Sequence, residues 1–103
     1  MVMTKRKPVS VGEMLITEFM EPSDITQGQL AVAMGVSRKT ANQLCLNKTA
    51  VTVDTALMLA TVFDNTAEFW LNLQRRNDIW DALHSAKRKA RINRAKPINE
   101  ASL

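Results

Sequence analysis

The fold of this chain is decided by residues 26–46, TQGQLAVAMGVSRKTANQLCL. The stretch predicts two short helices joined by a tight turn at Gly35, where the backbone takes a positive φ that glycine adopts at no steric cost. Ala31 stands where the two helices would cross, and its small side chain would let them approach closely. Apolar residues recur at helical spacing and would point inward. They are Leu30, Met34, Val36, Ala41 and Leu44.

The outer face of the second of these helices is polar and partly basic. Two short helices crossing at a tight turn, the second with such a face, form a helix-turn-helix, whose second helix enters the major groove of DNA. Arginine and lysine pair with guanine, glutamine pairs with adenine, and a threonine methyl packs on thymine. A glutamine at the start of the first helix would hold a phosphate. The expected DNA contacts are Gln27, Ser37, Arg38, Lys39, Thr40, Asn42, Gln43 and Lys48.

The rest of the chain also has helical periodicity, and no segment alternates with the period of two that a strand requires. Ser10 and Glu13 predict a capping box at the start of a first helix. Thr26 predicts the cap of the second helix and Ser37 that of the third. Thr52 predicts the cap of a fourth helix, and Thr66 predicts that of a fifth, which can continue past Leu83 toward Arg91. We therefore expect an all-α, five-helix repressor-like domain whose long fifth helix is C-terminal.

The charge divides the chain into three parts. The net charge of +4 conceals an acidic middle, because residues 8–86 carry five basic and nine acidic side chains, a net of −4. Basic residues gather at 5–7 and 87–96. We expect a basic N-terminal arm at 1–8, the domain at 9–92 and a frayed tail at 93–103. The basic ends could grip DNA phosphates, or they could be solvated tails; both interpretations remain open.

Size and composition restrict the class of protein. A chain of 103 residues with 46% hydrophobic content is one small domain. Its apolar runs are too short to cross a membrane, and its N-terminus lacks the apolar segment of a signal peptide. A single cysteine, Cys45, excludes an internal disulfide and fits a reducing compartment. We expect a cytoplasmic protein without membrane contact.

An enzyme is not indicated. His84 is the single histidine, no Cys/His set has metal-ligand spacing, and no glycine-rich phosphate loop is present. Asp78 and Asp81 would share one helix face, but flanking Arg75 and Arg76 favour surface ion pairs. We expect no catalytic site, no metal and no cofactor.

A homodimer is expected, because one helix-turn-helix covers about half of an operator and tight operators place half-sites about one helical turn apart. Surplus apolar surface on the fifth helix predicts the interface at Ile79, Trp80 and Leu83. Trp70, directly after a helix start, is expected in the core. For Trp80, a core position and an interface position both remain open.

Three stretches resemble one family. TAEFWLNLQRRNDI at 66–79 resembles the (S/T)-x-E-F-W-L-x-L-Q-x-x-Y-D-L signature of HigA-type antitoxins, a branch of the Cro/repressor-like helix-turn-helix proteins also called the VapI group. SVGEMLITEFMEP at 10–22 and VTVDTALMLATVFD at 51–64 resemble two further segments of that family. Three residues depart from the pattern: Asn47 and Asp64 stand where glycine is usual, and Asn77 replaces a tyrosine. Asn and Asp tolerate positive φ, so the first two preserve the fold.

The resemblance implies a five-helix domain that dimerises, binds its own operator and represses its operon. It also implies binding and neutralisation of a partner toxin, typically a ribosome-dependent mRNA-cleaving nuclease of the HigB/RelE type. The family's DNA-reading positions fall on Ser37, Arg38, Lys39, Thr40 and Gln43, with Gln27 as the backbone clamp. A stand-alone phage-type repressor without a toxin is the alternative, with the same fold and DNA face.

An acidic surface is the candidate toxin contact. An RNA-cleaving toxin would be basic, and an acidic face would attract it. Acidic residues gather around the first helix, and we hypothesise that toxin binds at Glu13, Glu18 and Glu21, near Asp24. An ordinary solvated helix face is the alternative.

Overall fold

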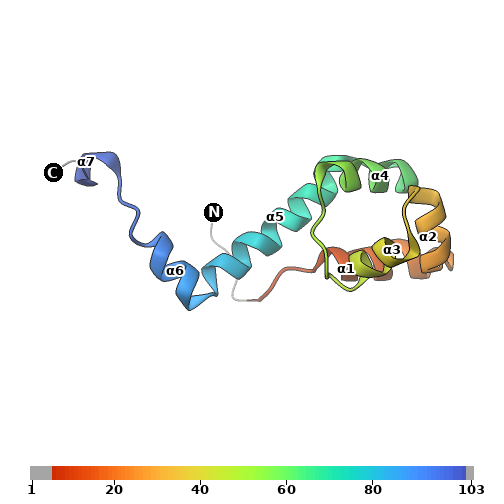
Figure 1. Ribbon diagram of the computed structural model, residues 1–103, viewed down its shortest axis with the longest axis horizontal. Helices are drawn as coiled ribbons and strands as arrows, with labels where there is room; N and C mark the ends of the chain where they lie inside the picture. Colours follow the sequence, from red (N-terminus) through yellow and green to blue (C-terminus); the bar gives the residue numbers. More distant parts are fainter. Residues whose placement is uncertain (1–5, 102–103) are drawn as a thin grey trace.

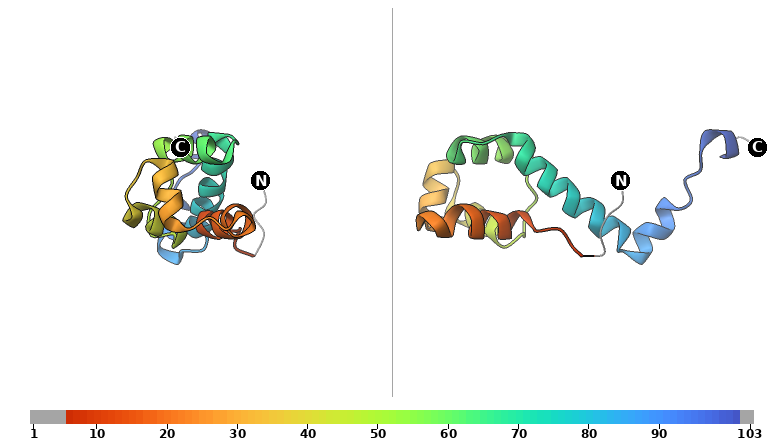
Figure 2. Two further views of the ribbon diagram at one scale, coloured as in Figure 1. Left: turned by 90° about the vertical axis from the view of Figure 1, so that its right-hand side faces the viewer. Right: turned by 180° about the vertical axis from the view of Figure 1, so that it is seen from behind.

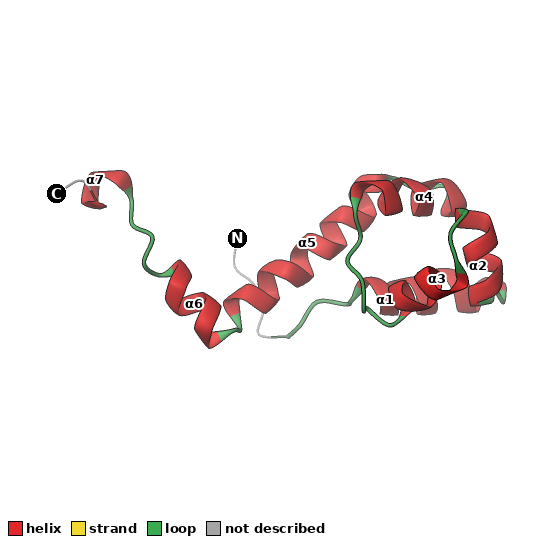
Figure 3. Ribbon diagram, viewed as in Figure 1, coloured by secondary structure: helices red, strands yellow, loops and turns green. Residues whose placement is uncertain are grey.

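The computed structural model describes residues 6–101, and within this range the chain is all-α (Figures 1 and 3). The elements are α1 (Val11–Met14), η1 (Leu15–Met20), η2 (Glu21–Ser23), α2 (Gln27–Met34), α3 (Arg38–Cys45), α4 (Val53–Phe63), α5 (Ala67–Leu83), α6 (Ala86–Ile92) and α7 (Ile98–Ala101). The all-α, helix-turn-helix prediction is confirmed. Lys5 of the expected N-terminal arm, and Ser102 and Leu103 of the expected tail, lie outside the described residues.

The helices from α1 to α4 form a bundle that α5 closes along one side and then leaves (Figure 1). α6 and α7 continue beyond the bundle, so the molecule measures 58 Å along its longest axis and 24 and 23 Å along the others. α1, η1 and η2 follow one another directly, with η1 wound as a π-helix and η2 as a 3₁₀ turn. The elongated shape places the basic C-terminal segment far from the helix-turn-helix.

Hydroxyl side chains begin the helices as expected. A side-chain oxygen accepts a hydrogen bond from the main-chain nitrogen three residues later at each of Ser10, Thr26, Ser37, Thr52 and Thr66. At α2 the capping box is complete, because Gln29 also accepts from the nitrogen of Thr26. At α1 the reciprocal bond from Glu13 that the sequence predicted is absent, and Ser10 instead accepts from the amide of Asn47 at 2.9 Å.

The fifth helix ends earlier than its longest expected extent. α5 stops at Leu83, and Ser85 caps the separate helix α6 by accepting from the nitrogen of Arg88 at 3.3 Å. His84 closes α5, because its main-chain nitrogen and its ring Nδ1 both lie within hydrogen-bond distance of the Trp80 carbonyl, at 3.0 and 2.8 Å. Continuous helical periodicity had hidden this break, since α6 resumes the helix within three residues.

The core is aliphatic around α2 and α3 and aromatic between η1, α4 and α5. Trp70 is fully buried, as predicted, and its indole nitrogen donates to Asn65 Oδ1 at 2.9 Å. Phe19 lies 5.0 Å, between ring centroids, from both Phe63 and Trp70. This aromatic cluster fixes α5 to the bundle, because such tilted ring pairs add to the burial of large apolar surfaces.

Two departures from the family pattern keep the backbone geometry of glycine. Asn47 has φ 58° and Asp64 has φ 52°, so both residues lie in the left-handed region, as predicted. Asn47 does more than glycine could, because its Oδ1 accepts from the nitrogen of Gly12 at 2.8 Å. A Cβ on Gly12 would collide with the Cys45 carbonyl. The end of α3 and the start of α1 are therefore in direct contact.

The segment before α1 lies along the second half of α5. Lys7 forms a 3.2 Å ion pair with Asp81, and its ammonium lies 5.6 Å from the ring centroid of Trp80. The half-buried Trp80 ring also stacks on His84 with centroids 3.8 Å apart. Trp80 thus packs against its own chain outside the main core, and its place in a dimer interface stays a prediction.

Candidate nucleic-acid interface

α2 and α3 meet at a turn with the geometry that the sequence predicted. Gly35 ends α2 with φ 76° and ψ 33°, and its nitrogen donates to the Ala31 carbonyl at 2.9 Å. The nitrogen of Val36 donates to the same carbonyl at 3.0 Å. Ala31 and Ala41 are both buried, at 4% and 0% exposure. Small side chains at the crossing and a left-handed glycine in the turn therefore hold α3 at a fixed angle on α2.

The first turn of α3 presents cations to solvent. Ser37 caps the helix by accepting from the nitrogen of Thr40 at 3.1 Å, and the two hydroxyl oxygens are 3.0 Å apart. Arg38 and Lys39 follow the cap, and both are exposed. A Cβ on Gly28 would lie 3.6 Å from a terminal nitrogen of Arg38, so the guanidinium lies over the start of α2. A Cβ at this distance would be in ordinary van der Waals contact with the guanidinium.

Gln27, the residue expected to hold a phosphate, is held in place by a side chain of α3. Asn42 donates from Nδ2 to Gln27 Oε1 at 3.0 Å, across 15 residues of sequence. This bond occupies the acceptor of the Gln27 amide and leaves its NH₂ group as the donor for an external oxygen. Asn42, expected as a DNA contact, therefore also orients Gln27, a role that the sequence did not indicate.

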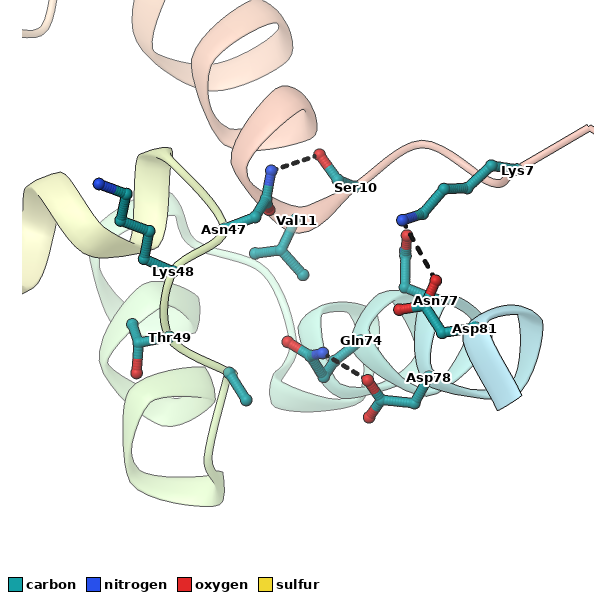
Figure 4. A pocket seen from close by; sticks show the side chains of 11 residues that line it. Lys7, Ser10, Val11, Asn47, Lys48, Thr49, Gln74, Asn77, Asp78 and Asp81 are labelled. Carbon is teal, nitrogen blue, oxygen red and sulfur yellow. Dashed lines mark hydrogen bonds and ion pairs between the residues drawn. The ribbon is translucent and has the colours of Figure 1, made fainter. Parts of the chain in front are cut away.

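The turn after α3 supplies one more cation. Lys48 follows Asn47, and its main-chain nitrogen donates to the Gln43 carbonyl at 2.8 Å. The exposed Lys48 side chain stands at the rim of a hollow of about 280 Å³ and is directed away from Lys7 and Asp81 (Figure 4). The hollow itself carries both signs of charge, so it is not a phosphate site. Lys48 is thus an exposed cation beyond the C-terminal end of α3, the helix that begins at Arg38.

The other predicted residues lie on different elements. Glu13 on α1, Glu18 on η1 and Glu21 on η2 are all exposed, so they form part of the surface of the first helical segment. Ile79 and Leu83 are 37% and 40% exposed on the second half of α5. The residues predicted to contact DNA, toxin and a second copy thus lie on different elements.

Comparison with known proteins identifies the family. The helix-turn-helix family model matches residues 16–70, from η1 into α5. Over 95 residues the chain is 47% identical to Antitoxin HigA-1 of Vibrio cholerae, an alignment that covers 92% of this chain and 88% of that protein. The chain belongs to the helix-turn-helix family of HigA-type antitoxins.

Two further similarities cover the same length. The chain is 44% identical over 95 residues to an uncharacterized HTH-type transcriptional regulator of Haemophilus influenzae, covering 92% of this chain and 89% of that protein. The solved structure of Pseudomonas aeruginosa antitoxin HigA with the higBA promoter superposes with a TM-score of 0.79 at 33% identity, covering 88% of this chain and 98% of that one. The likeness to HigA-type proteins therefore includes α5 and is not confined to the helix-turn-helix.

As a HigA-type family member, the chain belongs with DNA-binding transcriptional regulators and with no known class of enzyme. Among the side chains of residues 6–99, no three His, Cys, Asp or Glu come together as potential metal ligands. No helix in that part of the chain combines the length and the apolar character needed to span a membrane.

Proposed function

We propose that this chain is an antitoxin that represses its own operon as a sequence-specific DNA-binding homodimer. We further propose that it neutralises a HigB/RelE-type mRNA-cleaving toxin by direct binding. One observation carries the proposal: an exposed, cationic first turn of α3, braced by the Gln27–Asn42 bond, in a chain 47% identical to an antitoxin over nearly its whole length. A stand-alone repressor without a toxin is the second candidate.

For DNA, α3 would enter the major groove with its N-terminal turn toward the bases. Arg38 and Lys39 carry the donors for guanine O6 and N7, and Gln43 can pair with adenine. The NH₂ group of Gln27 and the ammonium of Lys48 would hold phosphates on either side.

For the dimer, the second half of α5 is the proposed contact. Ile79 and Leu83 are four residues apart, so they share one face of the helix. Both side chains are more than a third exposed in the single chain, and a second copy would bury them. A dimer formed there would present two α3 helices to two half-sites of one operator.

For the toxin, the exposed carboxylates Glu13, Glu18 and Glu21 are the proposed contact. They lie outside the α2–α3 unit, so toxin and DNA would occupy separate surfaces. The variant E18Q/E21Q should weaken toxin binding at least tenfold in a calorimetric titration. The control D54N/E68Q removes two exposed carboxylates from α4 and α5 and should leave toxin affinity unchanged. Equal affinities for both variants would move the toxin contact elsewhere.

Co-expression tests the antitoxin proposal directly. Each small open reading frame adjacent to the gene is expressed alone and together with this chain, and growth is measured. We expect one neighbour to arrest growth and this chain to restore it. If no neighbour is toxic, the stand-alone repressor replaces the antitoxin, and promoter occupancy becomes the relevant measurement.

A further inference from the structure

The basic C-terminal segment has no role in the helix-turn-helix or in the proposed toxin contact. Residues 87–96 contain six cations and no acid. Every one of these cationic side chains is exposed, and none forms an ion pair with a described acidic residue. α6, which carries the first part of the segment, lies beyond the bundle at the end of α5 (Figure 1). Its position therefore leaves the cations open to an external anion.

Four of the six cations converge, which the sequence alone did not reveal. A hollow of about 310 Å³ lies among Lys87, Arg88, Arg91 and Arg94 around Ala90, and the aliphatic parts of these side chains form most of its wall. Lys87 and Arg91 are four residues apart and share one face of α6, and Arg94 follows in the turn after this helix. Lys89 and Lys96 do not line the hollow. Four basic residues thus surround one hollow with their aliphatic stems on its wall, and two further lysines lie outside it.

A polyanion such as DNA complements this cationic surface better than the proposed toxin does. Like charges at i, i+4 destabilise a helix, so Lys87 and Arg91 gain from a bound anion. An RNA-cleaving toxin would be basic, and four cations in one hollow would repel it. Backbone phosphates carry the required charge, and arginine forks match their oxygens.

The position of α6 favours the DNA that α3 reads. In Figures 1 and 2, α6 lies on the side of the long axis opposite α4, and α3 also lies away from α4 on that side. A duplex on the outer face of α3 that ran along the 58 Å axis of the molecule would extend toward α6. In the dimer proposed above, α6 directly follows the α5 interface, so such a contact would fall on the side of each half-site that faces the dimer axis.

We propose that Lys87, Arg88, Arg91 and Arg94 clamp backbone phosphates of duplex DNA flanking the segment read by α3. The inference rests on the proposed operator binding and adds a second, sequence-independent contact to it. Phosphate contacts of this kind raise affinity and its salt dependence without changing base preference.

The test compares two variants that each lose two positive charges. K87Q/R91Q removes cations from the hollow, and K89Q/K96Q removes two outside it. Fluorescence anisotropy measures the affinity of the full chain for a duplex from its own promoter. The salt concentration is varied between about 0.05 and 0.3 M, because counterion release changes the affinity strongly in this range. Sedimentation of each variant confirms an unchanged oligomeric state.

K87Q/R91Q should reduce the slope of log affinity against log salt by about 1.8, about 0.9 for each lost phosphate contact, and K89Q/K96Q should leave it near wild type. Equal slopes for the two variants would overturn the clamp. Wild type that does not distinguish the promoter from a shuffled duplex of equal length would instead overturn the proposed operator binding.

Discussion

Asn77 donates a hydrogen bond from its side-chain amide to the main-chain carbonyl of Val9, 68 residues earlier, at 2.9 Å. The same nitrogen donates to the Leu73 carbonyl at 2.9 Å, and the side chain is only 7% exposed. One buried amide therefore joins the segment before α1 to the middle of α5. The family signature has a tyrosine at this position, so this chain fixes its N-terminal segment through a different side chain.

Replacing Asn77 with alanine should lower the free energy of unfolding by about 1–3 kcal/mol, because the part-buried bond to Val9 and the buried bond to Leu73 are both lost. Urea denaturation measures the change. The control N72A removes an exposed asparagine from the same helix and should cost less than about 0.5 kcal/mol. Equal losses in the two variants would show that the Val9 bond contributes nothing.

Substitutions at Asn47 and Asp64 distinguish the contribution of backbone geometry to stability from that of side-chain hydrogen bonds. Both have positive φ, but only Asn47 bonds to another element, at Gly12 and Ser10. N47G should destabilise the protein by about 1–3 kcal/mol, because glycine keeps the geometry and loses the bonds that hold α1. D64G should be neutral or slightly stabilising, because glycine adopts positive φ freely. Thermal unfolding of both variants measures the two effects. An N47G variant as stable as wild type would contradict a stabilising role of the Asn47 side-chain bonds.

Arg38 should contribute directly to base recognition. R38A should weaken binding to the promoter duplex by about 1–3 kcal/mol if the guanidinium makes a bidentate base contact. The matched control R76A removes an exposed arginine from α5 and should bind as wild type does. Anisotropy with promoter and shuffled duplexes measures both effects. A loss that is the same on both duplexes would assign Arg38 to phosphate instead.

The buried thiol of Cys45 should make the free energy of unfolding fall at high pH. Burial raises the pKa of the Cys45 thiol, so the folded chain keeps the proton that the unfolded chain releases above its ordinary pKa of about 8.5. The unfolded state then binds fewer protons, and the free energy of unfolding falls as pH rises above that value. Denaturation at pH 7 to 10 should show a steeper decline for wild type than for C45A. Parallel curves would refute the assignment.

Leu83 should be required for the dimer and Leu57 should not. Leu83 on α5 is 40% exposed and Leu57 on α4 is 53% exposed, so Leu→Glu costs little in a monomer at either position. L83E should convert the dimer to a monomer in sedimentation velocity, because the proposed interface would bury its charge. L57E should remain dimeric. A dimeric L83E would place the interface elsewhere.

Most of the helix-turn-helix could be predicted from helix caps and turn residues that act on their near neighbours. Thr26, Ser37 and Gly35 act within four residues of their own position, so their roles could be predicted from neighbouring residues. The break at His84 and Ser85 was missed although it is local, because the helical periodicity continues through it. The roles of the DNA-contact, toxin-contact and dimer residues remain predictions, and in the structure these residues lie on different elements.

The sequence by itself determined the all-α class, the five helix caps, the turn at Gly35 and the positive φ of Asn47 and Asp64. Each depends on the stereochemistry of one residue and its near neighbours. Only the tertiary structure decided what joins distant segments: Asn77 to Val9, and Asn42 to Gln27. It also decided which four cations of the basic segment share one hollow. These pairings require the helices to be packed first, because a side chain reaches its partner only after the backbone has brought the two together.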